Sequence, residues 1–470
     1  MKKLITPLVT VILAAAPAGA QDGASKGIAE PSVRSHMEFL ASDALNGRGS
    51  GTRDEWIAAA YIASQLRRWG IEPLGDDGGY VQEVQIERSE TAAPPTLSFP
   101  GGQLTHGKEM LIQALSAATI SGPLQKLQGD AATQPGAVVL LAEGAPSPRP
   151  APAAGAPAPP AIIITLENDQ QRTRRQAATA RPLTLPARIA GLPPSTGPSR
   201  PAAIAVDKES YAALSKIVDG TRLTLQAELK PPQISHTWNA IGRLRGRSAK
   251  AAGEVILLTA HLDHLGNRAA TAGSPATSSA PAGDAIFNGA DDDASGSVAV
   301  LELAEQLAKG KRPKRTVIFA WFGSEESGGY GARHFVDAPP VPLDTIVANL
   351  EFEMIGRADK AVPPHSLWLT GYERSDLGPE LARKGARIVA DPHPDQNFFQ
   401  RSDNIQLARR GVVAQTISSF GLHTDYHRAS DEVKTIDFAH LTASIRSMLA
   451  PVRWLANSGF KPVWLPGKKP

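Results

Sequence analysis

The sequence contains no cysteine, so no disulfide bond can hold its fold together and no thiol is available for a lipid anchor. It also has no large excess of charge of either sign, because 49 basic and 46 acidic residues leave a net charge of only +3. Its one short basic run, at residues 311–315, precedes an apolar strand as a solvated turn would, and no tract favours nucleic-acid binding. After residue 20 no segment is long and apolar enough to span a bilayer. The chain therefore has to fold around a hydrophobic core, for which an apolar content of 42% is ample.

The first 20 residues have the three parts of a secretory signal peptide. Residues 1–3 include two lysines, residues 4–17 are mostly apolar, and residues 18–20 form a small-x-small cleavage site. We therefore expect residues 1–20 to be removed during export. The mature chain is predicted to be periplasmic or extracellular and to carry no membrane anchor.

A change of composition near Glu90 predicts that the rest of the chain has two parts. Residues 91–235 are rich in Pro, Gly, Ala and Gln and contain no cluster of His, Asp and Glu, and residues 145–160 within them are typical of an exposed loop. We interpret 91–235 as a small β-rich domain inserted into a larger domain formed by residues 21–90 and 236–470. A decorated part of a single domain is the alternative.

From residue 237 onward, apolar strands alternate with amphipathic helices. This alternation predicts an α/β fold with a mostly parallel central sheet that is covered by helices on both faces. Ligands of such sheets bind beyond the carboxyl ends of the strands. The predicted strands are 80–86, 137–142, 161–165, 255–260, 315–322, 346–350 and 411–417, and the predicted helices are two between residues 32 and 69, then 296–308, 329–336, 377–387 and 437–456.

Histidines and carboxylates occur in this part of the chain where predicted strands end. A lone acidic residue in a loop is usually solvated, but several imidazoles and carboxylates delivered to one edge of a sheet form a set. We expect five strand ends to contribute. The residues are His261, Asp292, the pair Glu325 and Glu326, Glu353, and His427.

Two histidines and three carboxylates suit a pair of divalent metal ions that share one carboxylate and a water molecule. The two ions would be held by His261, Asp292 and Glu353, and by Asp292, Glu326 and His427. Such a water loses its proton near neutral pH, and a carboxylate that is not a ligand then has to accept that proton. Glu325, adjacent to a proposed ligand, is the candidate for this base.

Further residues near this set have less specific assignments. Asp263 could orient a ligand histidine, and Asp431 could play a similar supporting role. The Tyr426 hydroxyl could stabilise an oxyanion, with a packing role as the alternative. Arg357 could bind a substrate carboxylate or pair with a local acid. We interpret His264 as a loop histidine with a local hydrogen bond, and a role as an alternate ligand is the other possibility.

The set resembles peptidase family M28, a family of zinc peptidases, over about residues 237–455. The family pattern is His-x-Asp, Gly-Ala-x-Asp-Asn/Asp-Ala-Ser-Gly, Glu-Glu-x-Gly, Asp/Glu-Met-x-Gly, and a His near a downstream Asp. The matching segments are His261-Leu262-Asp263, Gly289 to Gly296, Glu325-Glu326-Ser327-Gly328, Glu353-Met354-Ile355-Gly356, and His427 to Asp431.

The resemblance implies a zinc-exopeptidase-like fold with two zinc ions per chain, in which Asp292 bridges the ions and Glu325 acts first as general base and then as general acid. It gives the same five ligands as the residue pattern, and it implies that residues 91–235 correspond to a protease-associated insert. Two positions depart from the family pattern. Glu353 stands where many members have aspartate, and Asn404 replaces the histidine of a Ser-Asp-His motif.

Together these features predict a secreted metallo-exopeptidase with peptide substrates, namely an aminopeptidase. A carboxypeptidase or dipeptidase on the same site is one alternative, and an arginine in the pocket would favour it because a C-terminal carboxylate needs a cation. A glutaminyl cyclase, with one zinc ion, and a metal-free peptidase-like binding protein are the others. The sequence predicts neither the side-chain preference nor the oligomeric state.

Overall fold

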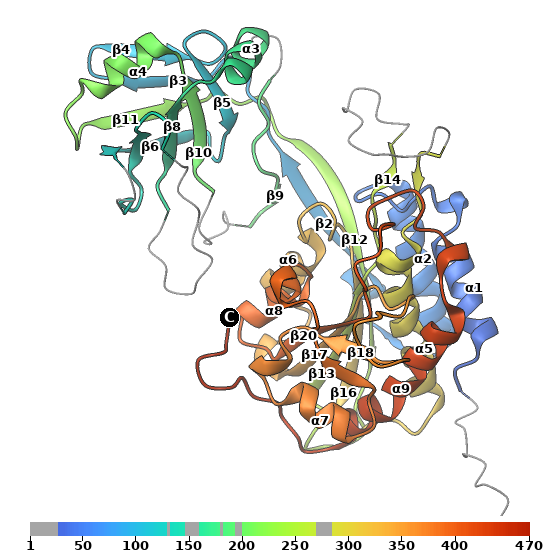
Figure 1. The fold of residues 1–470 in the computed structure, drawn as a ribbon. Coiled ribbons are helices and arrows are strands. Elements are labelled where there is room, and N and C mark those ends of the chain that lie inside the picture. The colour runs from blue at the N-terminus through green and yellow to red at the C-terminus, as the bar shows by residue number, and fades with distance from the viewer. Residues whose placement is uncertain (1–26, 129–131, 146–158, 179–181, 193–199, 269–283) are drawn as a thin grey trace, which may run out of the picture.

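A computed structural model describes residues 27–128, 132–145, 159–178, 182–192, 200–268 and 284–470. The predicted signal peptide lies outside these ranges, as do most of the predicted loop at 145–160 and most of the segment 267–287. Within the ranges, no helix combines the length and the apolar character that a bilayer span requires. The described chain forms two large sheets, each with its own hydrophobic core (Figure 1).

The elements of the main body alternate between strand and helix, as the sequence predicts. Its helices are α1 (Glu30–Leu40), α2 (Arg53–Arg68), α5 (Gly296–Lys309), α6 (Tyr330–Asp337), α7 (Leu377–Arg383), α8 (Asn404–Arg409) and α9 (Phe438–Asn457). Its strands are β1 (Glu72–Pro73), β2 (Val81–Arg88), β9 (Arg188–Ile189), β12 (Gln233–Leu244), β13 (Val255–His261), β16 (Thr316–Phe322), β17 (Ile346–Phe352), β18 (Leu367–Leu369), β19 (Ile388–Ala390) and β20 (Ala414–Ser418).

The main sheet is parallel at its centre and antiparallel toward its edges. Its order is β19-β18-β20-β17-β13-β16-β12-β2-β9, with β1 paired to β12. The four central strands β20, β17, β13 and β16 run parallel, whereas β12 is antiparallel to β16 and β18 is antiparallel to β20. The carboxyl ends of the four central strands therefore meet at one edge.

Helices cover both faces of this sheet because the central strands are apolar on both sides. Along β13, Ile256 and Leu258 pack into the core under α1, α2, α5 and α9, while Leu257 packs into the core under α6 and α8. The two faces alternate because successive strand side chains point to opposite sides. This packing on both faces fixes the register of β13 and hence the position of the residue at its end.

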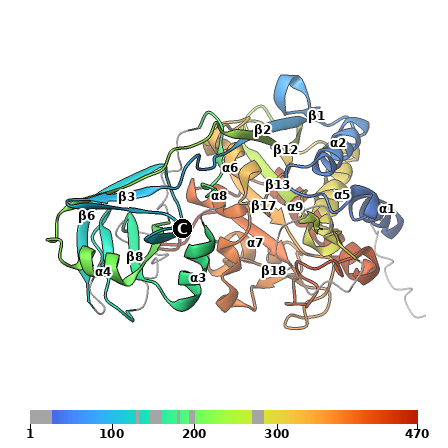
Figure 2. The same ribbon diagram turned by 90° about the horizontal axis from the view of Figure 1, so that it is seen from above.

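The inserted segment forms a second sheet with the order β4-β3-β11-β6-β7-β8-β10-β5. Two long antiparallel strands, β2 and β12, lead into it and back, and the sheet lies to one side of the main body in both views (Figures 1 and 2). Its elements are β3 (Thr96–Phe99), β4 (Gly102–Thr105), β5 (Met110–Ala114), β6 (Thr119–Leu127), β7 (Val138–Leu141), β8 (Ile162–Leu166), α3 (Asp169–Ala177), β10 (Ala202–Val206), α4 (Lys208–Ser215) and β11 (Arg222–Gln226).

Some local predictions differ from the structure for identifiable reasons. The helix predicted at 377–387 ends at Arg383, because Gly385 adopts φ +97°, a conformation outside the helical region. The short strands β18 and β19, at one end of the sheet, have too few residues to show an alternating pattern. β9 lies within the segment predicted as the insert, yet it pairs with β2 of the main sheet.

Candidate active site

Four strand ends and one turn bring the predicted site residues together. His261 is the last residue of β13, Glu325 and Glu326 follow β16, and Glu353 follows β17. His427 lies in the long loop after β20. The expectation of five strand ends is wrong at one position. Asp292 comes from the turn Ala290–Ser295 that precedes α5, rather than from a strand of the main sheet.

Two groups of potential metal ligands share one carboxylate. His261, Asp292 and Glu353 each offer a ligand atom, and these atoms lie within 4.8 Å of one another. The same holds for His264, Asp292 and Glu326. Asp292 therefore occupies the position between the two groups that a bridging ligand requires.

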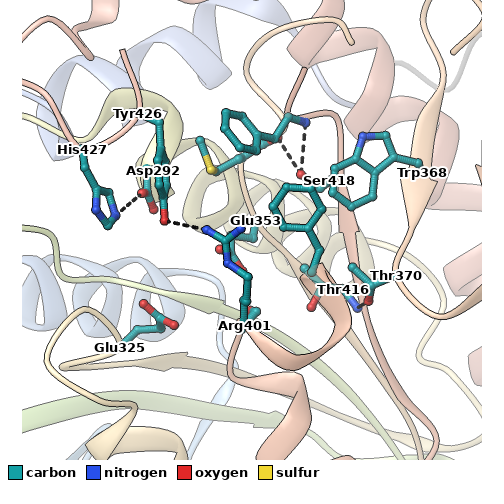
Figure 3. A pocket seen from close by; sticks show the side chains of 14 residues that line it. Asp292, Glu325, Glu353, Trp368, Thr370, Arg401, Thr416, Ser418, Tyr426 and His427 are labelled. Atoms are coloured by element: carbon teal, nitrogen blue, oxygen red, sulfur yellow. Dashed lines mark hydrogen bonds and ion pairs between the residues drawn. The ribbon is translucent and has the colours of Figure 1, made fainter. Parts of the chain in front are cut away.

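Both oxygens of Glu326 face an imidazole. His264 Nδ1 lies 2.8 Å from Glu326 Oε1, and His427 Nε2 lies 3.2 Å from Glu326 Oε2. His427 Nε2 also lies 3.3 Å from Asp292 Oδ2 (Figure 3). The sequence predicted His427 here and placed His264 in a loop hydrogen bond. The structure instead buries the His264 ring against Glu326. The second histidine of the sequence His261-Leu262-Asp263-His264 was the feature that could have indicated this position in advance.

The flanking aspartates of the acidic triplet have structural partners. Asp291 accepts the Gly356 amide at 2.7 Å and lies 2.9 Å from His423 Nε2. Asp293 accepts the Met354 amide at 3.0 Å. Three adjacent buried carboxylates repel one another, so each needs its own donors. Asp291 and Asp293 tie the turn before α5 to the loop after β17, which leaves Asp292 directed at the histidines.

Asp263 and Asp431 both accept backbone amides of candidate site residues. The Asp263 carboxylate accepts the Glu325 amide at 3.0 Å and the Ser50 hydroxyl at 2.5 Å. His261 Nδ1 lies 3.7 Å from this carboxylate and 3.2 Å from the Asp263 backbone carbonyl, so Asp263 also faces the ligand histidine that the sequence predicted it to orient. The Asp431 carboxylate accepts the Asp292 amide at 3.1 Å. Both side chains are fully buried. Each therefore positions a candidate site residue through its main chain.

Arg357 pairs with local acids, which is one of the two roles that the sequence left open. Its guanidinium donates to Asp425 at 2.6 Å and to Asp431 at 2.7 Å. A second arginine at the site, Arg48, was missed. It is buried in the glycine-rich link after α1 and donates to backbone carbonyls of residues 262, 288 and 289, so that it joins the N-terminal helices to both metal-site loops.

The electrostatics of the cluster reflect an excess of buried carboxylates. Burial raises the pKa of Glu325 well above its usual value, and neighbouring carboxylates add to this effect. Burial and Asp292 also act to raise the pKa of Glu326, but His264 and His427 hold it at about 2. Burial acts to lower the pKa of His427, but Asp292 and Glu326 raise it to about 10. The carboxylates thus require cationic partners, and the imidazoles supply them here.

The donor set also fits metal ions. Imidazole nitrogens and carboxylate oxygens are ligands that zinc accepts, and they bind it in the deprotonated form. Two buried atoms of the cluster, Glu353 Oε2 and His264 Nε2, have no hydrogen-bond partner among the described residues. Buried polar atoms without partners are uncommon in folded proteins. Ions placed within the two ligand groups would supply the missing partners and the missing positive charge.

A pocket opens onto this cluster. Asp292, Glu325 and Glu353 line one part of it, and the other lining residues are Met354, Trp368, Thr370, Phe398, Arg401, Ser402, Thr416, Ser418, Phe420, Tyr426 and His427 (Figure 3). The Tyr426 ring stacks on the His427 ring with centroids 3.9 Å apart. Arg401 Nη2 donates to the Tyr426 hydroxyl at 3.3 Å. Arg401 was not among the predicted site residues, although it directly precedes the Ser402-Asp403-Asn404 motif. Asn404 itself is buried away from the lining.

The model of peptidase family M28 matches residues 239–452, the part of the chain that contains every one of these candidate ligands. Residues 239–452 belong to peptidase family M28. The resemblance inferred from the motifs is thereby confirmed, and the M28 region contains the four parallel central strands of the main sheet together with α5 to α8 and most of α9.

Curated relatives resemble parts of the chain. It is 45% identical to an aminopeptidase of Pseudomonas aeruginosa (strain UCBPP-PA14) over 76 residues, which are 16% of this chain and 14% of that protein. It is 25% identical to leucine aminopeptidase 1 of Pyrenophora tritici-repentis over 247 residues, covering 48% of this chain and 58% of the relative. The chain thus spans a small part of the first relative and little more than half of the second.

The fold of this chain matches a solved structure over most of the length of both chains. An aminopeptidase from Aneurinibacillus sp. strain AM-1 matches 93% of this chain and 96% of its own, with a TM-score of 0.51 and 16% sequence identity. At this identity the match concerns the fold, and it confirms the prediction of an α/β architecture with a large central sheet between helices.

Proposed function

We propose that this chain is an exported metallo-exopeptidase that binds two zinc ions and acts as an aminopeptidase. The observation that carries the proposal is the convergence of two potential ligand groups on Asp292, beside a partly buried carboxylate, Glu325, that belongs to neither group. The aminopeptidase names of the partial relatives support the same conclusion.

The proposed ligands are His261, Asp292, Glu326, Glu353 and His427, with Asp292 shared. His427 is proposed in place of His264, the histidine of the second ligand group, because its Nε2 lies 3.3 Å from Asp292 and 3.2 Å from Glu326. When bound, the ions would polarise the peptide carbonyl and lower the pKa of a water molecule. Glu325 accepts the proton of the attacking water on a carboxylate oxygen and then delivers it to the nitrogen of the leaving amine. The Tyr426 hydroxyl accepts a hydrogen bond from Arg401, so its own proton is available to the carbonyl oxygen of the substrate.

The acidic end of the pocket favours an amino terminus at the metal site, whereas Arg401, elsewhere in the pocket lining, is the cation that a dipeptidase would need for a C-terminal carboxylate. Asp292, Glu325 and Glu353 line the acidic end together, and an ammonium group is attracted to such a surface whereas a carboxylate is repelled. A bound peptide would therefore be oriented with its N-terminal residue next to these acids, as an aminopeptidase requires.

A panel of blocked and free substrates tests the proposal. The zinc-loaded chain should hydrolyse leucine p-nitroanilide and release single N-terminal residues from peptides, and it should not hydrolyse the N-acetylated forms. Equal cleavage of free and acetylated substrates would exclude an aminopeptidase. Release of C-terminal residues from acetylated peptides would assign a carboxypeptidase, and cyclisation of N-terminal glutamine without hydrolysis would assign a glutaminyl cyclase.

A further inference from the structure

Arg401 is a cation in the pocket lining for which the described part of the chain supplies no acidic partner. Its guanidinium carbon lies 4.9 Å from the centroid of the Phe398 ring, and its Nη2 donates to Tyr426. Among the described residues no Asp or Glu forms an ion pair with it. Arg357, in contrast, has two carboxylate partners within 2.7 Å. An arginine has five N–H donors in a planar fork, so Arg401 has further donors to offer a ligand.

The pocket around Arg401 is divided into an acidic end and an apolar wall. The acidic residues Asp292, Glu325 and Glu353 lie at the metal site, while Trp368 and the nearby aromatic side chains of residues 398 and 420 form the wall. A substrate carboxylate would be repelled at the acidic end and would gain nothing from the wall. Among the described lining residues Arg401 is the one arginine or lysine, and its guanidinium can compensate the charge of a carboxylate.

Arg401 also lies close to the proposed reaction centre. It contacts the Tyr426 hydroxyl, the Tyr426 ring stacks on His427, and His427 Nε2 lies 3.3 Å from Asp292. This chain of contacts places the guanidinium one side chain away from a proposed ligand. A carboxylate bound to Arg401 would therefore belong to a residue next to the scissile bond.

We propose that Arg401 binds a carboxylate of the substrate, and that this site therefore selects short peptides with a carboxylate adjacent to the scissile bond. The inference rests on the proposed hydrolysis at this site. The carboxylate can be the free C-terminus of a dipeptide or the side chain of an acidic residue, and both present the same planar pair of oxygens to the guanidinium.

Amidation of a dipeptide removes its carboxylate without changing the scissile bond. Wild-type protein should hydrolyse leucylglycine with a kcat/KM at least about tenfold higher than that of leucylglycinamide, mainly through KM, as expected for a charge-assisted contact. Arg401→Gln should bring this ratio to about one, and Arg401→Lys, which keeps the charge but not the fork, should give an intermediate ratio. Arg409→Gln, on the exposed side of α8, is the matched control and should keep the wild-type ratio.

The source of the carboxylate is resolved by a second pair of substrates. Hydrolysis of Leu-Asp amide is compared with that of Leu-Asn amide, which has the same shape but no charge. A preference for the aspartyl substrate that Arg401→Gln removes assigns a side-chain carboxylate, whereas a preference confined to leucylglycine assigns the C-terminus. Either result supports carboxylate binding by Arg401.

Two results would overturn the inference. One is a wild-type ratio near one for both substrate pairs. The other is an Arg401→Gln variant that loses activity equally on each member of a pair, because that pattern means that Arg401 only positions Tyr426. Calorimetric titration of the Glu325→Gln protein with leucylglycine and its amide gives the same comparison without turnover. If the wild-type protein hydrolyses no peptide, the proposed function is contradicted. The calorimetric titration would still decide whether Arg401 binds the carboxylate.

Discussion

At the scale of single residues, Glu325 and Glu326 are neighbours in the chain with different surroundings. Glu326 faces two imidazoles, whereas Glu325 lies in the pocket and is held by the hydrogen bond between its backbone amide and Asp263. Burial raises the pKa of Glu325. A carboxylate in this environment that does not bind an ion can accept and return a proton during the reaction.

The substitution Glu325→Gln should abolish hydrolysis and keep the metal ions. Glutamine has nearly the same shape as glutamate but cannot accept the water proton, so we expect kcat to fall by a factor of about 100 or more. Zinc content, measured by mass spectrometry, and the far-ultraviolet circular dichroism spectrum should match those of the wild type. Retained hydrolysis would remove Glu325 from the mechanism.

The two histidines beside Glu326 should differ in their effect on metal content. His427 contacts both Asp292 and Glu326, and it is the proposed ligand, so His427→Ala should lose one of the two proposed zinc ions together with hydrolysis. His264 contacts Glu326 from the other side, and we expect His264→Ala to weaken zinc binding less. Zinc titrations of both variants measure this order. The reverse order would make His264 the ligand.

Residues of the site differ in how far the sequence could predict them. His261, Glu326 and Glu353 follow central strands, and the parallel sheet brings such positions to one edge whatever the details of packing. Arg401 and Arg48 act through contacts with segments far away in the chain, so no local pattern indicates them. Met354 and His427 adopt left-handed backbone conformations that non-glycine residues seldom use, which sequence patterns do not reveal.

At the scale of elements, α1 and α5 pack together with two buried titratable groups between them. His36 Nε2 of α1 lies 4.0 Å from Glu302 Oε1 of α5. Burial raises the pKa of Glu302 from 4.5 to about 7 and lowers the pKa of His36 from 6.5 to about 4. Because the pKa of Glu302 is raised on folding, its contribution to the free energy of unfolding falls as the pH rises from about 4.5 to 7. Because the pKa of His36 is lowered on folding, its contribution rises as the pH rises from about 4 to 6.5.

Glu302→Gln should stabilise the fold at pH 8 and leave it nearly unchanged at pH 5. The folded state no longer carries the cost of a buried carboxylate, which amounts to at most about 3 kcal/mol for this pKa shift. We expect the melting temperature at pH 8 to rise by several degrees. Glu38→Gln, on the exposed side of α1, is the control and should change little at either pH. An equal shift of Glu302→Gln at both pH values would contradict the explanation.

At the scale of the whole molecule, the insert and the main body have separate cores. The insert core contains Leu225 and the main core contains Leu303, and both side chains are fully buried. The composition change near Glu90 indicated this division, and the long strands β2 and β12 provide the connection (Figure 1). The sequence did not indicate that β9 returns to the main sheet, because a strand of two residues has no recognisable pattern. The domain boundaries themselves stay a prediction.

Separate cores predict that the two parts lose their structure independently. Leu225→Ala should destabilise the insert by about 2–5 kcal/mol, through lost burial and the cavity that it leaves, and should lower one calorimetric transition. The temperature at which hydrolysis is lost should stay at its wild-type value. Leu303→Ala, the matched change in α5, should lower that temperature instead. A single transition that shifts in both variants would show that the two cores unfold together.

The central claim is that the carboxyl edge of the main sheet holds two metal ions on either side of Asp292. Its most direct test is the zinc content of the purified chain after zinc loading and removal of free metal, measured by mass spectrometry against protein concentration. We predict about two zinc ions per chain, as expected for two ligand groups that share one carboxylate. A content of one ion or none would contradict the account.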